Sequence, residues 1–301
     1  MNSNDLLRAL SVPQGPVDVV LDTDTYNEID DQFALSYLMR SPELHTKAIY
    51  AAPFFNENSS GPEDGMLKSY DEIFKVLKLL GERAEVYKGS PAYLPDEHTP
   101  VVSPAAEDLC RRAKEYRPER PLYVVAIGAI TNIASAILMD PSITDRIVVA
   151  WLGGHGLDFH DTKEFNLIQD VAAARVVMGS GAPFVQLPCY GVVSAFSTSR
   201  PELEYWLKGK NPLADYLCRN TIEAAESYAA GTAWSRIIWD VTAVAWLLNR
   251  DDRFMLSRLQ PVSLPAYDGQ YERCPTAHLM RYVYQINRDA LLTDLFKKLT
   301  D

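Results

Sequence analysis

The sequence predicts an α/β fold in which a mainly parallel central sheet is covered by helices on both faces. Between residues 17 and 188, short apolar runs rich in β-branched residues alternate with longer stretches of helical periodicity. Repeated alternation of this kind is typical of βαβ units, whose crossover helices pack against a parallel sheet from both sides. The elements support this prediction one after another along the chain.

The first strand and the first helix have the clearest patterns. The run VDVVLD (17–22) predicts a buried strand, and DQFALSYLMR (31–40) predicts a helix, because apolar residues such as Phe33 and Tyr37 recur at helical spacing. Further strands are predicted over 47–52, 84–89, 122–128, 146–154 and 184–188. Further helices are predicted over 65–81, 105–116, 132–139 and 170–181, the first of which closes with Gly81.

The pattern changes after residue 200. From Pro201 to about Asn249 it is helical and rich in tyrosine and tryptophan, and residues 280–299 predict one strand followed by one helix. No repeat, low-complexity tract or linker interrupts the chain. We therefore expect residues 1–301 to form a single domain, with the helical segment 200–249 lying over the active site.

Size and charge limit the function classes. The chain has 301 residues, of which 47% are hydrophobic and 23% charged. This length and hydrophobic content are enough for a large core. Its formal net charge is −11, and it has no cluster of lysine and arginine. This argues against nucleic acid and against an anionic membrane surface as partners. A small neutral or cationic ligand, or a metal ion, suits the charge better.

Cysteine spacing and the N-terminal residues bear on the compartment. Cys110, Cys189, Cys218 and Cys274 are too widely spaced for a zinc or redox CxxC motif, so we expect free thiols of a reducing cytosol. The first residues lack the basic head and apolar stretch of a signal peptide. No apolar run approaches the roughly 18 residues of a membrane span. These features predict a cytoplasmic protein.

The turn after the first predicted strand is strongly acidic, with Asp22, Asp24, Glu28, Asp30 and Asp31 close together. Helix capping accounts for an aspartate at position 30 or 31, but not for the two that leave an apolar strand. Ligands of open α/β sheets bind beyond the carboxyl ends of the strands, where polar loops also follow the second, fourth and fifth strands. Hard divalent cations prefer carboxylate oxygens, so the pattern indicates a cation site.

The acidic turn also carries a family resemblance. DTDTYNEIDDQFAL (22–35) resembles the N-terminal DxDPGxDDxxAL motif of the inosine–uridine-type nucleoside hydrolases. Five further segments resemble family motifs in the right order, so that the resemblance extends over roughly residues 17 to 250. They are EVYKGSPAYL (85–94), AIGAITNIASAI (126–137), VVAWLGG (148–154), KEFNLIQDVAAA (163–174) and WDVTAVAWLL (239–248).

The resemblance implies an enzyme that hydrolyses the N-glycosidic bond of ribonucleosides to free base and ribose, using one Ca²⁺ per chain. Asp24 matches the residue that ligates the ion and acts as general base on the water it holds. Asp31 and Asp240 match carboxylate ligands, and Thr131 matches a ligand through its backbone carbonyl. Asp22 matches a supporting acid behind these ligands.

The same resemblance implies the substrate contacts. Asp30 matches a contact to the ribose 2′-hydroxyl, and Glu164 and Asn166 match a pair that hydrogen-bonds the ribose. Asn56 matches a further contact, with Asn58 as a close rival in a divergent loop. Asp158 has the spacing of a ribose-contacting asparagine but differs in residue type.

Two departures from the family pattern concern the chemistry of the leaving base. Two residues are inserted between Asp24 and Asp30, and TYNEI replaces a Pro-Gly turn. Trp239 stands where one subgroup has a histidine that protonates the base; an indole stacks on a base but cannot give it a proton. His155 and His160 are candidate replacements. Tyr228, Trp234 and Arg236 lie in the segment expected to cover the base.

Two other functions stay open at this point. A DxD after a strand also begins haloacid-dehalogenase-type phosphatases, although Tyr26 stands where these have threonine or valine. The absence of the leaving-group histidine is also compatible with a nucleoside-binding member of weak turnover.

The family resemblance further implies a homodimer or homotetramer.

Overall fold

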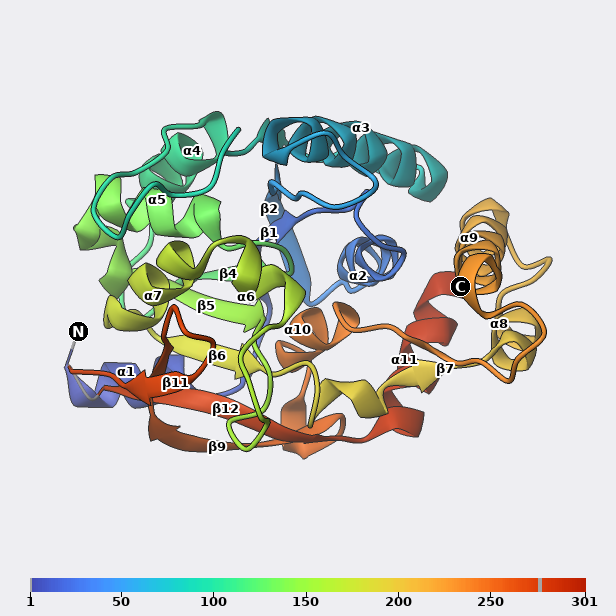
Figure 1. The fold of residues 1–301 in the computed structure, drawn as a ribbon. Helices are drawn as coiled ribbons and strands as arrows, with labels where there is room; N and C mark the ends of the chain where they lie inside the picture. The colour runs from blue at the N-terminus through green and yellow to red at the C-terminus, as the bar shows by residue number, and fades with distance from the viewer. Residues whose placement is uncertain (1, 276–277) are drawn as a thin grey trace.

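The central feature of the fold is a twisted sheet, seen nearly edge-on in Figure 1. The computed structural model describes residues 2–275 and 278–301. Within these residues the sheet has eight strands in the order β3-β2-β1-β4-β5-β6-β12-β9, and only the β12–β9 pair is antiparallel. The strands are β1 (Val17–Thr23), β2 (Leu44–Ala51), β3 (Val86–Lys88), β4 (Leu122–Ala126), β5 (Ile147–Leu152), β6 (Phe184–Leu187), β9 (Met255–Pro261) and β12 (Leu279–Ile286).

Helices cover both faces of the sheet. On one face α2 packs against α3 and α10, and on the other α5 packs against α4 and α7. The helices are α1 (Ser3–Ala9), α2 (Asp30–Met39), α3 (Pro62–Leu80), α4 (Pro104–Ala113), α5 (Thr131–Met139), α6 (Phe165–Gln169), α7 (Val171–Gly179), α8 (Arg200–Trp206), α9 (Pro212–Ala229), α10 (Val241–Trp246) and α11 (Arg288–Thr300). No described helix is both long and apolar enough to cross a membrane.

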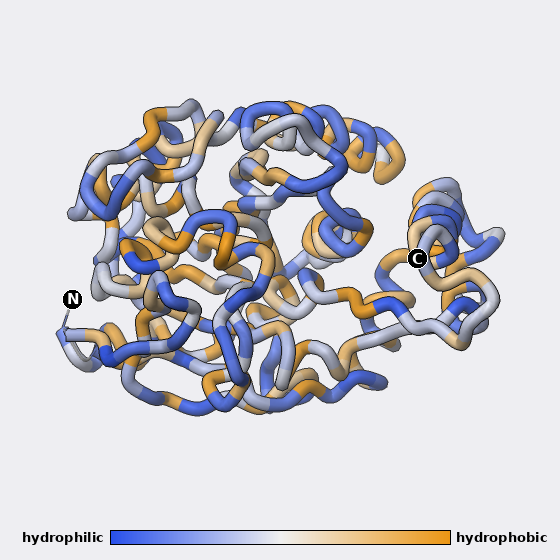
Figure 2. Tube along the Cα trace, in the orientation of Figure 1, coloured by the Kyte–Doolittle hydropathy of each residue, from blue (hydrophilic) through white to orange (hydrophobic). Residues whose placement is uncertain are grey.

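Each face of the sheet has its own hydrophobic core, because side chains alternate between the faces along a strand. In β1, Val19 and Leu21 pack into the core beneath α2 and α3, whereas Val20 packs into the core beneath α4 and α5. Figure 2 shows α3 carrying both hydrophobic and hydrophilic residues along its length. Its buried residues, including Ile73 and Val76, face the core, as expected for a helix on the surface of a sheet.

The strand order places the site. From β1 the chain adds β2 and β3 toward one edge, and then β4, β5 and β6 toward the other. Strand order therefore reverses between β1 and β4, and ligands of open α/β sheets bind at such a switch point. Asp24 follows β1 directly and Gly128 follows β4. A Cβ at Gly128 would lie 2.9 Å from Asp24 Oδ1, so the two loops touch.

The predicted α/β class is confirmed, and the predicted strands and helices up to residue 188 are present. The strand expected over 84–89 is shorter, at Val86–Lys88, and the segment 201–249 contains α8, α9 and α10 together with the short strand β8 (Arg236–Ile237). Strand β9 was not predicted. It lies at the edge of the sheet with Arg258, Leu259 and Pro261 exposed, and polar residues interrupt it, so it lacks the continuous apolar run of a central strand.

Short ribbons complete the fold. Strand β8 pairs with β7 (Ser197–Thr198), and β10 (Ser263–Pro265) pairs with β11 (Tyr271–Arg273), both antiparallel. Two- and three-residue strands leave no periodic signal, and none of these was predicted. The four cysteines are buried, and none of them forms a disulfide within the described residues, as predicted.

Candidate active site

A pocket of about 190 Å³ lies at the switch point between β1 and β4. Its walls come from the loops after β1, β4, β5 and β6 and from the turn before α10, segments far apart in the sequence. Because all these strands are parallel, their carboxyl ends meet at one edge. The lining residues are Asp24, Asn27, Glu28, Asp30, Asp31, Ile127, Leu152, His155, Lys163, Glu164, Phe165, Asn166, Cys189, Tyr190, Trp239 and Asp240.

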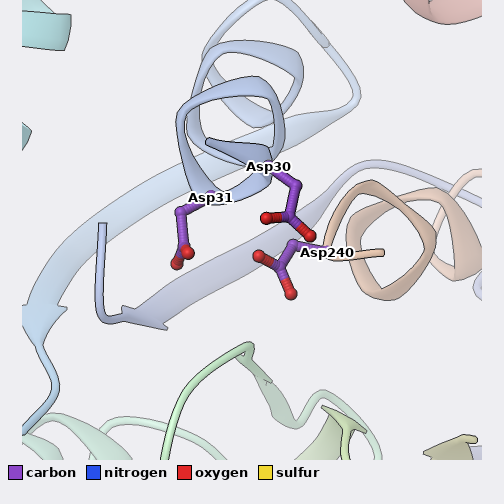
Figure 3. Close-up of side chains that lie close together, drawn as sticks. All are labelled: Asp30, Asp31 and Asp240. Atoms are coloured by element: carbon purple, nitrogen blue, oxygen red, sulfur yellow. The ribbon is translucent and has the colours of Figure 1, made fainter. Parts of the chain in front are cut away.

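Four aspartates converge on this pocket, and each is at most 4% exposed. Asp30 and Asp31 occupy the first turn of α2, and Asp240 is the residue before α10. Each of these three offers a carboxylate oxygen within 4.8 Å of the others, and Figure 3 shows their side chains turned toward one another. Asp24 lies beside them and interacts with Asp31.

Burial together with mutual repulsion raises the pKa values of these carboxylates. Burial raises the pKa of Asp31 to about 7. It also raises the pKa of Asp24 well above its usual range, and the neighbouring charge of Asp31 adds to the effect. The pKa values of Asp30 and Asp240 are raised for the same reasons, burial first and the neighbouring carboxylates second. At neutral pH such a cluster needs either bound protons or a cation.

The donor set fits a hard divalent cation. Both carboxylate oxygens of Asp24 are buried and have no hydrogen-bond partner among the residues that the structure describes. Buried polar atoms are nearly always paired, so these oxygens call for a ligand. The pocket offers carboxylate oxygens in the number and kind that Ca²⁺ or Mg²⁺ prefers. Its lining has one histidine and one cysteine, His155 and Cys189, and among the described residues neither belongs to a group of three or more side chains that could hold a metal.

Thr23 and Asn132 hold the acidic turn in place. The Thr23 hydroxyl donates to Asp31 Oδ1 at 2.5 Å. The Asn132 amide donates to Asp22 Oδ1 at 2.7 Å and accepts from the Ser90 backbone N–H at 2.7 Å. This one side chain ties the end of β1 to the loop after β3. Sequence reasoning did not single it out, although it follows Thr131 directly within the resembling ITN motif.

Replacing Asn132 by alanine is expected to lower the free energy of unfolding by at least about 2 kcal/mol, because each buried group left unpaired costs about 1–3 kcal/mol. Urea unfolding monitored by tryptophan fluorescence measures this loss. The matched control is Asn4→Ala, at an exposed position of α1. Equal unfolding midpoints for both variants would show that the Asn132 bonds do not stabilise the site.

Glu164 and Asn166 lie in the pocket wall with most of their polar atoms engaged. The Glu164 carboxylate caps α6 by accepting from the backbone N–H groups of Asn166 and Leu167 at 2.8 and 3.0 Å, and it accepts a third bond from Gly154. The Asn166 amide donates to the carbonyls of Ile127 and Leu152, both at 3.1 Å. These bonds leave the Asn166 amide oxygen as the acceptor available to a ligand.

The other predicted residues lie at different distances from the pocket. Trp239 lines it, half-buried, with its ring edge-on to Tyr190 at 5.4 Å between centroids. Thr131 is buried at the start of α5, where its hydroxyl donates to Asp170, and it is not among the lining residues. Asn56 donates to Asn27 and lines a neighbouring cavity. Asp158 is exposed and lies outside the pocket lining.

Besides the apolar Ile127, Leu152 and Phe165, the lining residues Lys163, Cys189 and Tyr190 were not singled out as site residues from the sequence. Cys189 and Tyr190 follow the strand β6 almost directly, so their place at the edge of the sheet was a usable signal. Of the two candidate histidines, only His155 lines the pocket. Burial lowers its pKa, and its Nδ1 lies 3.4 Å from the Tyr190 backbone N–H, which donates to it.

The fold and the pocket together define a class of protein: an α/β protein with a switch-point pocket walled by buried carboxylates of the kind that bind hard cations. The chain belongs to the inosine-uridine preferring nucleoside hydrolase family, whose model matches residues 19–289. The resemblance and the enzyme class predicted from the sequence, hydrolysis of the N-glycosidic bond of ribonucleosides, are thereby confirmed. The match leaves the phosphatase alternative without support.

Individual relatives agree with this family. A pyrimidine-specific ribonucleoside hydrolase of Salmonella paratyphi A is 23% identical over 260 residues, covering 77% of this chain and 79% of that protein. A probable ribonucleoside hydrolase of Dictyostelium discoideum is 28% identical over 101 residues, and this match covers only 33% of this chain and 29% of that protein. The solved structure of a purine-preferring ribonucleoside hydrolase from Gardnerella vaginalis has the same fold, with a TM-score of 0.75 at 20% identity, covering 94% and 98% of the two chains.

Proposed function

We propose that this protein hydrolyses ribonucleosides to free base and ribose with the help of one Ca²⁺ ion, and that Asp24 is the general base. One observation carries the proposal: four buried aspartates share a pocket in which both oxygens of Asp24 lack a partner. A catalytic base must have a lone pair free to take a proton within reach of the substrate. Asp24 has a free lone pair of this kind without any rearrangement of its surroundings.

Asp24, Asp31, Asp240 and the backbone carbonyl of Thr131 are the proposed ligands of the ion. Asp30 also offers an oxygen within 4.8 Å of oxygens of Asp31 and Asp240, which makes it an alternative ligand. When bound, the ion would supply positive charge that lowers the pKa of a water molecule and attracts the ribose hydroxyls.

The chain's own groups then account for the remaining requirements of the reaction. Asp24 takes the proton of the attacking water, whose oxygen adds to C1′ as the C1′–N bond breaks. The sugar becomes positively charged in the transition state, and the surrounding carboxylates stabilise that charge. The free amide oxygen of Asn166 accepts from a ribose hydroxyl, and Asp30 accepts from another. Trp239 provides a face on which the base stacks.

The substrate contacts of Asn56, Glu164 and Asp158 stay predictions of the family resemblance. Asn56 is occupied with Asn27, and Glu164 with helix capping, so both would need to share their remaining lone pairs with a ligand. The cytoplasmic location and the homodimer or homotetramer also stay predictions. The named relatives include pyrimidine-specific and purine-preferring enzymes, so the base preference is a matter for assay.

Product analysis on a panel of substrates tests the function. The protein is incubated with purine and pyrimidine ribonucleosides and with p-nitrophenyl phosphate, each with EDTA or with Ca²⁺. Release of ribose with Ca²⁺ and its loss with EDTA support the proposal, and the ranking of the ribonucleosides gives the base preference. Thermal stabilisation by a ribonucleoside without ribose release would instead establish a binding protein of weak turnover.

A further inference from the structure

A second cavity of about 520 Å³ adjoins the active-site pocket. The two share Asn27 and Glu28, which belong to the loop carrying the inserted residues between Asp24 and Asp30. The active-site pocket itself, at about 190 Å³, is smaller than the roughly 300–1,000 Å³ of ordinary ligand sites. A nucleoside whose ribose fills the active-site pocket therefore has to extend beyond it. The second cavity is the adjoining space that can take the base.

Arg236 stands in the wall of this second cavity. It belongs to β8, which is paired with β7 through Thr198, and its side chain is only 17% exposed. Its Nη2 donates to the carboxylate of Glu28, a residue 208 positions away in the chain. Its Nε–H is buried and has no acceptor within residues 2–275 and 278–301. The charge of Arg236 also reaches Asp30, whose pKa it lowers against the stronger effect of burial.

The leaving base needs a group of this kind. When the C1′–N bond breaks, its electron pair goes to the base nitrogen, and the base leaves with developing negative charge. Trp239 cannot supply a proton to that nitrogen, and the pKa of the pocket histidine His155 is lowered by burial. An arginine stays charged at every pH at which the enzyme is folded, and its N–H groups can hydrogen-bond the departing anion.

We infer that Arg236 is a catalytic residue for the leaving group: its guanidinium, which is partly exposed in the wall of the second cavity, donates to the base there and stabilises it as an anion. This inference rests on the proposed function. The reaction balances without a further reagent, because water gives its hydroxide to C1′ and its proton to Asp24, and the released base then takes a proton from solvent. The preferred leaving groups are heterocycles with an oxygen or nitrogen acceptor beside the glycosidic nitrogen.

The inserted loop gains a role in this arrangement. Glu28 holds the guanidinium at the boundary of the two cavities and acts as a positioning residue. The loop that carries it is fixed in turn: the side-chain amides of Asn56 and Asn58 donate to the side chain and backbone carbonyls of Asn27 at 2.6 and 3.1 Å. Asn56, expected from the family resemblance to contact ribose, thus supports the loop that orients Arg236.

The test compares two leaving groups on the same protein. Uridine and inosine need stabilisation of the departing base, whereas p-nitrophenyl β-D-ribofuranoside releases p-nitrophenolate, a stable anion. Arg236→Gln is expected to lower kcat for the nucleosides by about 10²–10³-fold, the usual loss for one donor to a developing charge, and to leave the p-nitrophenyl riboside near the wild-type rate. Arg236→Lys should recover part of the loss, and Glu28→Gln should show a smaller loss with the same selectivity.

For each variant, the rates on a nucleoside and on the p-nitrophenyl riboside are measured on one preparation. An unfolded fraction lowers both rates equally, so it does not change their ratio. The matched control is Arg200→Gln, an arginine of α8 that pairs with Glu204 and Glu226 and lines neither cavity, and it should change neither rate. Equal losses on both substrates, or no loss on the nucleosides, would overturn the inference. Failure of the wild-type protein to hydrolyse either riboside would refute the proposed function itself and the inference with it.

Discussion

Replacing Asp24 by asparagine is expected to reduce ribose release by at least about 10³-fold, within the range of general-base catalysis. Asparagine has the same shape but cannot take a proton from water, and it weakens one cation ligand. The loss should appear in kcat for every ribonucleoside, because it affects a step common to all of them. Initial rates with saturating substrate and Ca²⁺ measure it.

The same substitution is expected to stabilise the cation-free protein, which separates loss of activity from loss of fold. Asp24 is a buried carboxylate with no hydrogen-bond partner, and burial raises its pKa. Removing an unpaired buried charge relieves a cost, so in EDTA at pH 8 the melting temperature of Asp24→Asn should exceed that of the wild type. The control is Asp71→Asn on the exposed surface of α3. Activity within tenfold of wild type for Asp24→Asn would refute its role as base.

Removing the cation is expected to abolish ribose release and to lower the melting temperature more at pH 8 than at pH 5. A cation at 100 times its Kd stabilises the folded state by about 2.7 kcal/mol. For a chain of this size that corresponds to a melting shift of several degrees, at roughly 2–4 °C per kcal/mol. Differential scanning fluorimetry at pH 5, 6.5 and 8, with EDTA or with Ca²⁺, measures the shift.

The pH dependence follows from the raised pKa values. Burial raises the pKa of Asp22 and of Asp31 to about 7, against 3.8 when the chain is unfolded. The folded protein therefore holds protons that the unfolded chain releases, and this stabilisation is complete below about pH 3.8 and lost as the pH rises through about 7. The cation replaces these protons, so its stabilising effect should grow across the same interval.

One variant checks that the effect comes from the carboxylate cluster. Asp31→Asn should show a smaller Ca²⁺-induced shift at pH 8 and a weaker dependence on pH, whereas Asp71→Asn should behave as the wild type. Equal Ca²⁺-induced shifts at pH 5 and pH 8 in the wild type would contradict a cation site built from groups with raised pKa values.

Much of the fold could be predicted because its signals are local. The central strands are buried on both faces, so each is a continuous apolar run such as VDVVLD, and surface helices such as α3 have the period of an amphipathic helix. The edge strand β9 and the two-stranded ribbons were missed because solvated or very short strands have no such pattern. The bonds of Asn132 to Asp22 and Ser90 were missed because they join three separate segments.

The sequence by itself determined the α/β class, the family, the order of the elements and the acidic turn that ends β1. These follow from residue patterns within single strands, helices and turns, whose conformations depend on near neighbours. Only the tertiary structure decided that Asp30, rather than Asp24, shares the tightest cluster with Asp31 and Asp240, and that Glu28 pairs with Arg236 beside a second cavity. Such pairings depend on how separate elements pack, because side chains distant in sequence meet only when the sheet and its helices are assembled.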